Sequence, residues 1–424
     1  MIFNLTKFLN ESYTPYHAVE NAKSLLTARG FKQLSERSDW KIEKGGKYFV
    51  ERGGSALIAF TVGNAERLAF KIVASHTDSP ALKIKENPLM KCENYTKLNV
   101  EKYGGGILYS FLDRPLKIAG RLSVKDGNKI VCKSVVSDYT LSIPSLAIHM
   151  NRNVNDGAAL NAQVDMCPLF SFADNANTSD FIKTLTSNEV LAYDLYVVNA
   201  QNSYEFGANG EFVGAPRIDN LSSVYSSLSA LTDGKNADGI CIAACLDSEE
   251  IGNQTAQGAA GDFLENVLKR IAYSLGANEE TYMQALASSF LLSLDVAHAA
   301  HPNHPEKHDP TNRTALGGGV VVKYNGNMAY VTDGKSSAVV KAIFDKADVK
   351  HQTFFNRSDM PCGSTLGRSF ISRVGMLAAD IGLPQLAMHS ACECFAKSDY
   401  VELVKGISAF YSTKLEITDD GVCI

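Results

Sequence analysis

Lys71-Ile-Val-Ala-Ser-His-Thr-Asp-Ser-Pro80 is the stretch that decides the fold. Its apolar run breaks off at His76, and Asp78 follows two residues later. The run predicts a buried strand that delivers an imidazole to its carboxyl end. A nearby carboxylate can fix the tautomer of that ring, which is how a histidine is prepared to hold a metal ion. His-x-Asp is common by chance, so its weight depends on the rest of the chain.

The same pattern, an apolar segment that ends in a side chain able to bind a metal, recurs three times downstream. The segments are Gly239–Leu246, Ser289–Leu294 and Leu383–Met388. The polar residues that follow them are Asp247, Glu249 and Glu250, then Asp295 and His298, then His389. Asp219 lies just ahead of a predicted helix and adds a carboxylate. Because an open α/β sheet binds ligands at the carboxyl ends of its strands, we expect these side chains to converge.

The residue types in this set are two histidines and a surplus of carboxylates, without a thiolate. They favour zinc, manganese or cobalt in a catalytic site over a closed structural zinc site. One metal with His, Asp and Asp and a second with Asp, Glu and His would share one carboxylate and leave one glutamate free. A bridged pair of ions can acidify a water, and a free glutamate can take its proton. Of the adjacent Glu249 and Glu250, one could bind metal while the other faces the water.

Taken singly, these residues have ordinary explanations. A strand-end aspartate such as Asp219 or Asp295 is usually a cap or turn residue. Two adjacent glutamates are usually a solvated charge pair, and His389 alone could be a core histidine with satisfied hydrogen bonds. The hypothesis of a metal centre therefore depends on their joint occurrence at four strand ends.

The bulk composition is that of an ordinary globular protein. The chain has 424 residues, with 45% hydrophobic and 21% charged, so two domains are expected. The net charge of −5 and the scattered aromatic residues predict no nucleic-acid partner. No apolar run approaches the roughly 20 residues that span a bilayer, and we expect no membrane partner and no signal peptide. Nine cysteines without a CxxC pair indicate a reduced, cytoplasmic protein.

Strand and helix patterns alternate at both ends of the chain and give way to a β-rich block between them. Outside the block, the periodicity predicts helices at 15–29, 220–232 and 261–275 and strands at 47–60 and 68–75. Inside it, short alternating segments are separated by turns such as Asp126-Gly127-Asn128, which predict hairpins. We predict an α/β fold: a central mixed β-sheet flanked by helices, formed by residues 1–85 and 206–424, with residues 86–205 inserted as a β-rich domain.

Two further stretches resemble sites of other kinds. His301-Pro-Asn-His304-Pro-Glu-Lys-His308 looks like a histidine-rich metal tract, but its prolines preclude a regular helix. Asp359-Met-Pro-Cys362-Gly-Ser could suggest a nucleophile, but it lacks the Gly-x-Ser-x-Gly elbow. We interpret the first as an ordered loop near the site and the second as a loop that shapes the substrate pocket.

Several motifs together carry a family resemblance. They are HTDSP (76–80), YGGGILYSFLDRPLKIAGRL (103–122), IPSLAIHMNR (143–152), PRIDN (216–220), DSEEIG (247–252), DVAHAAHPN (295–303), DMPCGSTLG (359–367) and MHS (388–390). In this order they resemble the aspartyl aminopeptidase family of dinuclear zinc metallopeptidases, in its bacterial form. Tyr13-Thr-Pro-Tyr-His-Ala18 is similar to the opening motif of that family. The stretch after His389, Ser-Ala-Cys-Glu-Cys, departs from the arginine–glutamate run expected there, which bears on the pocket wall.

The resemblance implies a role for each motif residue. His76 and Asp295 would hold one zinc ion, Glu250 and His389 the other, and Asp219 would bridge the two. Glu249 would be the general base, and Asp78 would orient His76.

The resemblance also implies how subunits cooperate. The inserted domain would dimerise, and its histidine, here His149, would reach the active site of the partner and help hold the substrate carbonyl as negative charge develops on its oxygen. Lys323 falls where a substrate-side lysine is expected and could pair with an acidic first side chain. Family members assemble into tetrahedral dodecamers, so self-association is expected.

The sequence therefore predicts a cytoplasmic metallo-aminopeptidase that releases amino-terminal residues from peptides through two zinc ions per subunit, with cobalt or manganese as possible replacements. The alternatives are a related dinuclear hydrolase acting on blocked or carboxyl-terminal substrates, and an inactive assembly scaffold. The preferred first residue, the native metal and the physiological role do not follow from the sequence.

Overall fold

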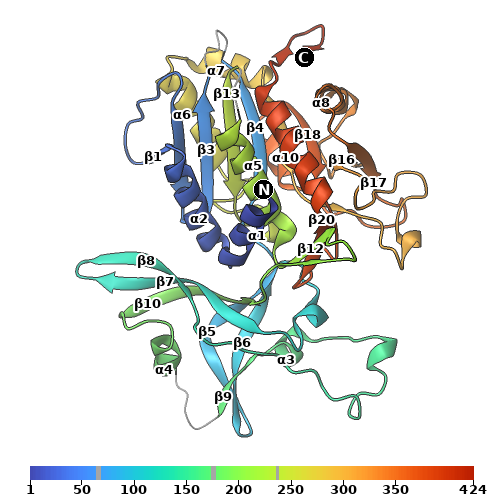
Figure 1. Ribbon diagram of the computed structural model, residues 1–424. Helices are drawn as coiled ribbons and strands as arrows, with labels where there is room; N and C mark the ends of the chain where they lie inside the picture. Colours follow the sequence, from blue (N-terminus) through green and yellow to red (C-terminus); the bar gives the residue numbers. More distant parts are fainter. Residues whose placement is uncertain (64–67, 173–177, 235–237) are drawn as a thin grey trace.

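A nine-stranded mixed sheet forms the centre of the molecule in the computed structural model (Figure 1). The structure describes residues 1–63, 68–172, 178–234 and 238–424. In spatial order the strands are β1 (Lys32–Leu34), β2 (Lys47–Arg52), β3 (Ala56–Val62), β13 (Ile240–Leu246), β4 (Phe70–His76), β14 (Phe290–Leu294), β18 (Leu377–Gly382), β16 (Val320–Tyr324) and β17 (His351–Phe355). The central strands β13, β4, β14 and β18 run parallel, and β3 and β16 are antiparallel to their neighbours in this group.

Helices cover both faces of this sheet. One face packs against α1 (Ile2–Glu11), α2 (Pro15–Ala28), α5 (Ile218–Asp233), α8 (Gly334–Lys346) and α10 (Lys397–Ser412). The other packs against α6 (Phe263–Ser274), α7 (Glu279–Ala287) and α9 (Leu366–Ile371). Because β4, β13 and β14 are buried on both faces, they are continuous apolar runs in the sequence.

A second sheet of six strands lies below the first in the view of Figure 1. Its order is β8 (Lys129–Val136), β7 (Leu116–Asp126), β10 (Val190–Asn199), β5 (Ala81–Cys92), β6 (Tyr95–Tyr103) and β9 (Leu169–Phe172). The short helices α3 (Ala162–Asp165) and α4 (Thr178–Lys183) belong to the same part of the chain. Pairing is antiparallel throughout, and the sheet has a hydrophobic core of its own.

A third, smaller sheet lies where the two larger ones meet (Figure 1). It consists of β11 (Tyr204–Phe206), β12 (Phe212–Ala215), β20 (Glu393–Ala396), β19 (Pro384–Leu386) and β15 (Ala297–His298). The strands β21 (Glu416–Ile417) and β22 (Val422–Cys423) form a hairpin near the end of the chain.

The predicted fold class is confirmed, and two local predictions need correction. The strand predicted over 47–60 is two strands, because Gly53 and Gly54 adopt φ values of 64° and 70° and turn the chain between β2 and β3. The strand predicted over 383–388 is only β19, and it pairs in the third sheet instead of the central one. The predicted helices correspond to α2, α5 and α6.

Candidate metal centre

Three parallel strands of the central sheet end at one place. The neighbours β13, β4 and β14 have matching registers, with Leu246 opposite His76. His76 is the last residue of β4, Asp295 directly follows β14, and Glu249 comes three residues after β13. Parallel strands bring their carboxyl ends to the same edge of the sheet, so residues separated by more than 200 positions meet there.

The other two side chains arrive from outside the central sheet. Asp219 lies in the first turn of α5, directly after β12, and His389 lies in the turn between β19 and β20. Three residues on the connections to the site adopt left-handed φ values: Arg217 at 61°, Ser248 at 65° and His389 at 66°. Non-glycine residues adopt this conformation at an energetic cost, and they concentrate at functional sites whose surroundings fix them.

The ligand-type atoms form two groups that share Asp219. His76 Nε2 lies 3.2 Å from Asp219 Oδ1 and 3.6 Å from Asp295 Oδ1. His389 Nε2 lies 3.4 Å from Asp219 Oδ2 and 3.5 Å from Glu250 Oε1. With zinc–ligand bonds of about 2.0–2.1 Å, the ligand atoms of a tetrahedral zinc site lie about 3.3–3.4 Å apart. The observed separations therefore fit two coordination polyhedra joined through one carboxylate.

Hydrogen bonding at the site also fits a bound cation. His76 Nδ1 lies 3.0 Å from the carbonyl oxygen of Asp78, which can only accept, so Nδ1 carries the proton and Nε2 offers a lone pair. Buried carboxylate oxygens of Asp219, Glu250 and Asp295 accept no hydrogen bond from any described residue. Lone pairs this close repel one another unless a cation lies between them, so the donor set suits a metal.

The side chains of Glu249 and Glu250 face different parts of the site. Glu250 is almost fully buried and faces His389, whereas Glu249 lines a cavity of about 210 Å³ together with His76, Asp295 and His389. Burial raises the pKa of the Glu249 carboxyl to about 8; His76 opposes this shift, and the carboxylates of Asp295 and Asp219 add to it. Adjacent divalent cations would lower that pKa, which leaves Glu249 an ionised base facing the cavity.

Two buried carboxylates hold the loops that carry these residues. The oxygens of Asp78 accept the backbone N–H groups of Glu249 at 3.1 Å and Glu250 at 3.2 Å. Glu393 accepts the backbone N–H groups of Asp219 at 3.0 Å and His389 at 2.8 Å. Burial raises the pKa of Glu393 to about 8. Asp78 was predicted as an orienting residue; Glu393 was missed, because it lies in the stretch that departs from the expected motif.

Comparison with known families identifies the family of the chain. The family model described as aminopeptidase I zinc metalloprotease (M18) matches residues 8–411. The chain belongs to the M18 family. It is therefore a zinc metallo-aminopeptidase, a hydrolase of peptide bonds, as the motifs indicated.

Individual M18 relatives align with almost the whole chain. A probable M18 family aminopeptidase 2 of Clostridium novyi is 40% identical over 96% of this chain and 98% of its own length. The solved complex of Ape4 and Nbr1 contains a chain 34% identical, with a TM-score of 0.91 over 97% of this chain and 85% of that one. The mApe1 dodecamer of S. cerevisiae is 27% identical, with a TM-score of 0.83 over 96% of this chain and 95% of that one.

Two further residues expected from the family resemblance, Lys323 and His149, lie outside the group of five clustered side chains. Lys323 lines the same cavity but is buried: its Nζ donates to the Val296 carbonyl at 3.1 Å and lies 3.9 Å from Asp295 Oδ2. His149 is exposed on a loop of the second sheet and is not brought to the site of its own chain. An acidic substrate side chain would have to share the Lys323 ammonium with Asp295.

The two stretches that resemble sites of other kinds, 301–308 and 359–364, add no side chain to the candidate metal centre. His301, His304 and His308 lie in an exposed, irregular loop that contains only one short 3₁₀ turn, Pro305–Lys307. Gly363 and Ser364, after Cys362, line the cavity. Across the described residues, no helix has both the length and the hydropathy required to cross a bilayer.

Proposed function

We propose that this M18 aminopeptidase works through two zinc ions, one held by His76, Asp219 and Asp295 and the other by Asp219, Glu250 and His389. The observation that carries the proposal is the position of Asp219. Its two oxygens face two different imidazole nitrogens, at 3.2 and 3.4 Å, and Oδ1 accepts no hydrogen bond from the described residues. A carboxylate in this position is suited to bridging two cations.

The chemistry divides between the metals and Glu249. Zinc supplies Lewis acidity, polarising the scissile carbonyl and lowering the pKa of an attacking water. Glu249 would accept a proton from that water and deliver it to the departing amine, and its position in the lining of the cavity supports both steps. Asp78 holds the backbone of Glu249 and so fixes where the base lies. The carboxylates of the site, with the metal they would hold, would bind the free α-amine of the substrate.

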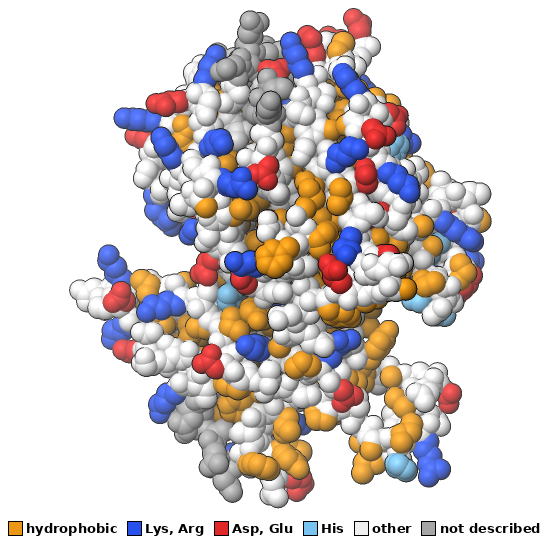
Figure 2. Space-filling model, in the orientation of Figure 1, with side chains coloured by type: hydrophobic (Ala, Val, Ile, Leu, Met, Phe, Trp, Pro, Cys, Tyr) orange, Lys and Arg blue, Asp and Glu red, His pale blue; other side chains and the backbone are white. Residues whose placement is uncertain are grey.

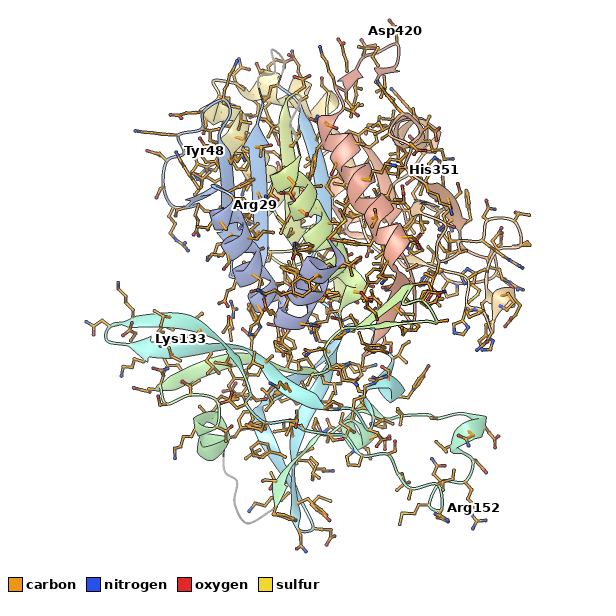
Figure 3. All side chains as sticks on the ribbon, in the orientation of Figure 1. Arg29, Tyr48, Lys133, Arg152, His351 and Asp420 are labelled. Atoms are coloured by element: carbon orange, nitrogen blue, oxygen red, sulfur yellow. The ribbon has the colours of Figure 1, made fainter. Side chains whose placement is uncertain are left out.

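Self-association completes the site in this proposal. The inserted domain, predicted at 86–205, is built on the second sheet, whose strands run from Ala81 to Asn199; it dimerises and presents His149 to the active site of the partner. A loop of this domain projects away from the central sheet, where Arg152 marks it in Figure 3, and apolar side chains are visible on the same projection in Figure 2. Its exposed apolar residues include Leu146, Ile148 and Met150. Exposed apolar groups in this number suit a subunit interface.

The assembly beyond the dimer, the cellular location and the choice of metal are predictions. A dodecameric relative supports assembly into a tetrahedral dodecamer, which would admit peptides and exclude folded proteins. We expect a cytoplasmic enzyme, and zinc to be replaceable by cobalt or manganese.

A pair of matched peptides tests the proposal. Peptides of one sequence, with a free or an acetylated amino terminus, are incubated with protein stripped by a chelator and then restored with zinc. We expect release of the first residue from the free peptide only, and only after two zinc ions per chain are restored. Cleavage of the acetylated peptide at a comparable rate would favour the related hydrolase on blocked substrates.

A further inference from the structure

One segment of the second sheet reaches the metal centre. Residues 103–107, Tyr-Gly-Gly-Gly-Ile, leave the end of β6 and run past the site before the 3₁₀ turn Leu108–Phe111; we call them the glycine strap. The strap belongs to a motif that supported the family resemblance, but the function proposed above does not use it. Its contacts reach both proposed zinc sites.

The first contact acts through Asp78. The Tyr103 hydroxyl donates a hydrogen bond to Asp78 Oδ2 at 2.8 Å. Asp78 already accepts the backbone N–H groups of Glu249 and Glu250, and its carbonyl accepts from His76 Nδ1. Tyr103 is therefore the third donor on a carboxylate that fixes the proposed base, Glu249, and one proposed ligand, Glu250.

The second contact acts on His389. Its Nδ1 lies 3.2 Å from the carbonyl oxygen of Gly105, and its own carbonyl accepts the N–H of Ile107 at 2.9 Å. A carbonyl oxygen only accepts, so Nδ1 must carry the ring proton. Nε2 is then left with the lone pair, and it faces Asp219 and Glu250. The strap thus selects the tautomer of His389 that can bind a metal.

The three glycines at the centre of the strap, residues 104–106, bring its backbone close to the proposed ligands. A Cβ on Gly104 would lie 3.1 Å from Cβ of Glu250, and the residue has a φ of 73°. A Cβ on Gly105 would stand 3.6 Å from His389 Nδ1. The distance at Gly105 is an ordinary contact, so the need for glycine lies at Gly104, where both the φ value and the approach to Glu250 disfavour a side chain.

We propose that the glycine strap is a positioning element of the metal centre, through which the second sheet sets the Asp78 carboxylate and the tautomer of His389. The inference rests on the two-zinc function proposed above. It gives the second sheet a part in its own chain's catalysis, separate from any part in assembly. The residues of the strap act through Asp78 and His389 and do not touch the reacting atoms.

Tyr103→Phe tests the first contact. The matched control is Tyr196→Phe, because the two rings pack edge to face at 5.5 Å and Tyr196 gives no hydrogen bond to Asp78. Zinc affinity is measured by competition with a chelating indicator, and kcat and KM with a free peptide. We expect Tyr103→Phe to weaken zinc binding or lower kcat by about 10- to 100-fold with KM nearly unchanged, while the control behaves as wild type.

Gly104→Ala tests the close approach. Gly127→Ala is the control, because Gly127 also has a positive φ, 58°, but a Cβ there would meet no atom within 4 Å. Both variants carry the same kind of backbone strain, and only Gly104→Ala should lose zinc affinity. Either strap variant matching its control would overturn the inference. Wild-type protein that binds fewer than two zinc ions would instead contradict the proposed function, so the two failures are distinguishable.

Discussion

At the scale of single residues, adjacent glutamates divide two tasks. Glu250 turns inward to His389, and Glu249 turns to the cavity. A left-handed residue, Ser248, precedes them, and Asp78 holds both of their N–H groups, so the backbone imposes the division. The same substitution is therefore expected to have different effects on metal binding and turnover at Glu249 and at Glu250.

Glu249→Gln should leave two zinc ions bound and lower kcat by about 100-fold or more, because the amide keeps the shape but accepts no proton. Zinc content is measured by atomic absorption and kcat with a free peptide. Glu250→Gln is the matched comparison, since it should lose metal as well as activity. Near-normal turnover of Glu249→Gln would remove that residue from the role of base.

Lys323 allows a sharp test of substrate preference. If its ammonium pairs with an acidic first side chain, Lys323→Met should lower kcat/KM for peptides that begin with Asp or Glu by about 10-fold or more relative to those that begin with Leu. The two peptide series are assayed side by side. An equal loss for both series would mean that Lys323 only holds Asp295 and the Val296 carbonyl in place.

At the scale of elements, helix α2 packs against the second sheet beside a buried histidine. His17 lies in the first turns of α2, its Nδ1 is 2.8 Å from Thr14 Oγ1, and the neighbouring Tyr16 packs against Tyr196 of β10. Burial, reinforced by the positive charge of Arg217, lowers the pKa of His17 to about 4. Protonation of this ring is therefore unfavourable in the folded chain.

The pH dependence of stability follows from the sign of that shift. The unfolded chain takes up the proton near pH 6.5 and the folded chain only near pH 4, so the contribution to stability is full above 6.5 and is lost as pH falls to 4. The loss is on the order of 3 kcal/mol. His17→Gln should flatten this part of the profile in denaturant unfolding, and the exposed His301→Gln should not. Parallel profiles for wild type and His17→Gln would contradict the assignment.

At the scale of the whole molecule, the central sheet supplies most of the proposed ligands, and the second sheet carries the histidine expected to act in the partner. His149 is exposed on its projecting loop, whereas the five clustered side chains lie far from that loop in the sequence. If His149 acts between subunits, two inactive variants can complement each other.

His149→Ala and Glu249→Gln should each be poorly active with zinc retained, and the mixed protein should recover activity. In a two-fold dimer, the subunit with Glu249 receives His149 from its partner, so one of the two sites in each mixed dimer is intact and the purified mixed dimer should recover about half of wild-type activity. The variants are co-expressed with different tags and the mixed species is purified. A mixture no more active than its components would rule out a role for His149 in the partner's site.

The sequence located those site residues whose neighbours along the chain form a recognisable pattern. His76 ends one fully buried strand and Asp295 follows another, so an apolar run that ends in a polar residue located them. Glu393 and the Gly105 carbonyl act through contacts between segments far apart in the chain, and nothing beside them in the sequence shows this. The position of His389 was predicted, but not the sheet that carries it, because β19 is too short to reveal its partner strands.

The central claim is that Asp219 joins two zinc ions. Anomalous X-ray scattering at the zinc edge, from crystals of zinc-loaded protein, tests it directly. We predict two peaks about 3.5–4 Å apart, one on each side of the Asp219 carboxylate, with His76 beside one and His389 beside the other. A single peak, or two peaks that do not share Asp219, would contradict the account.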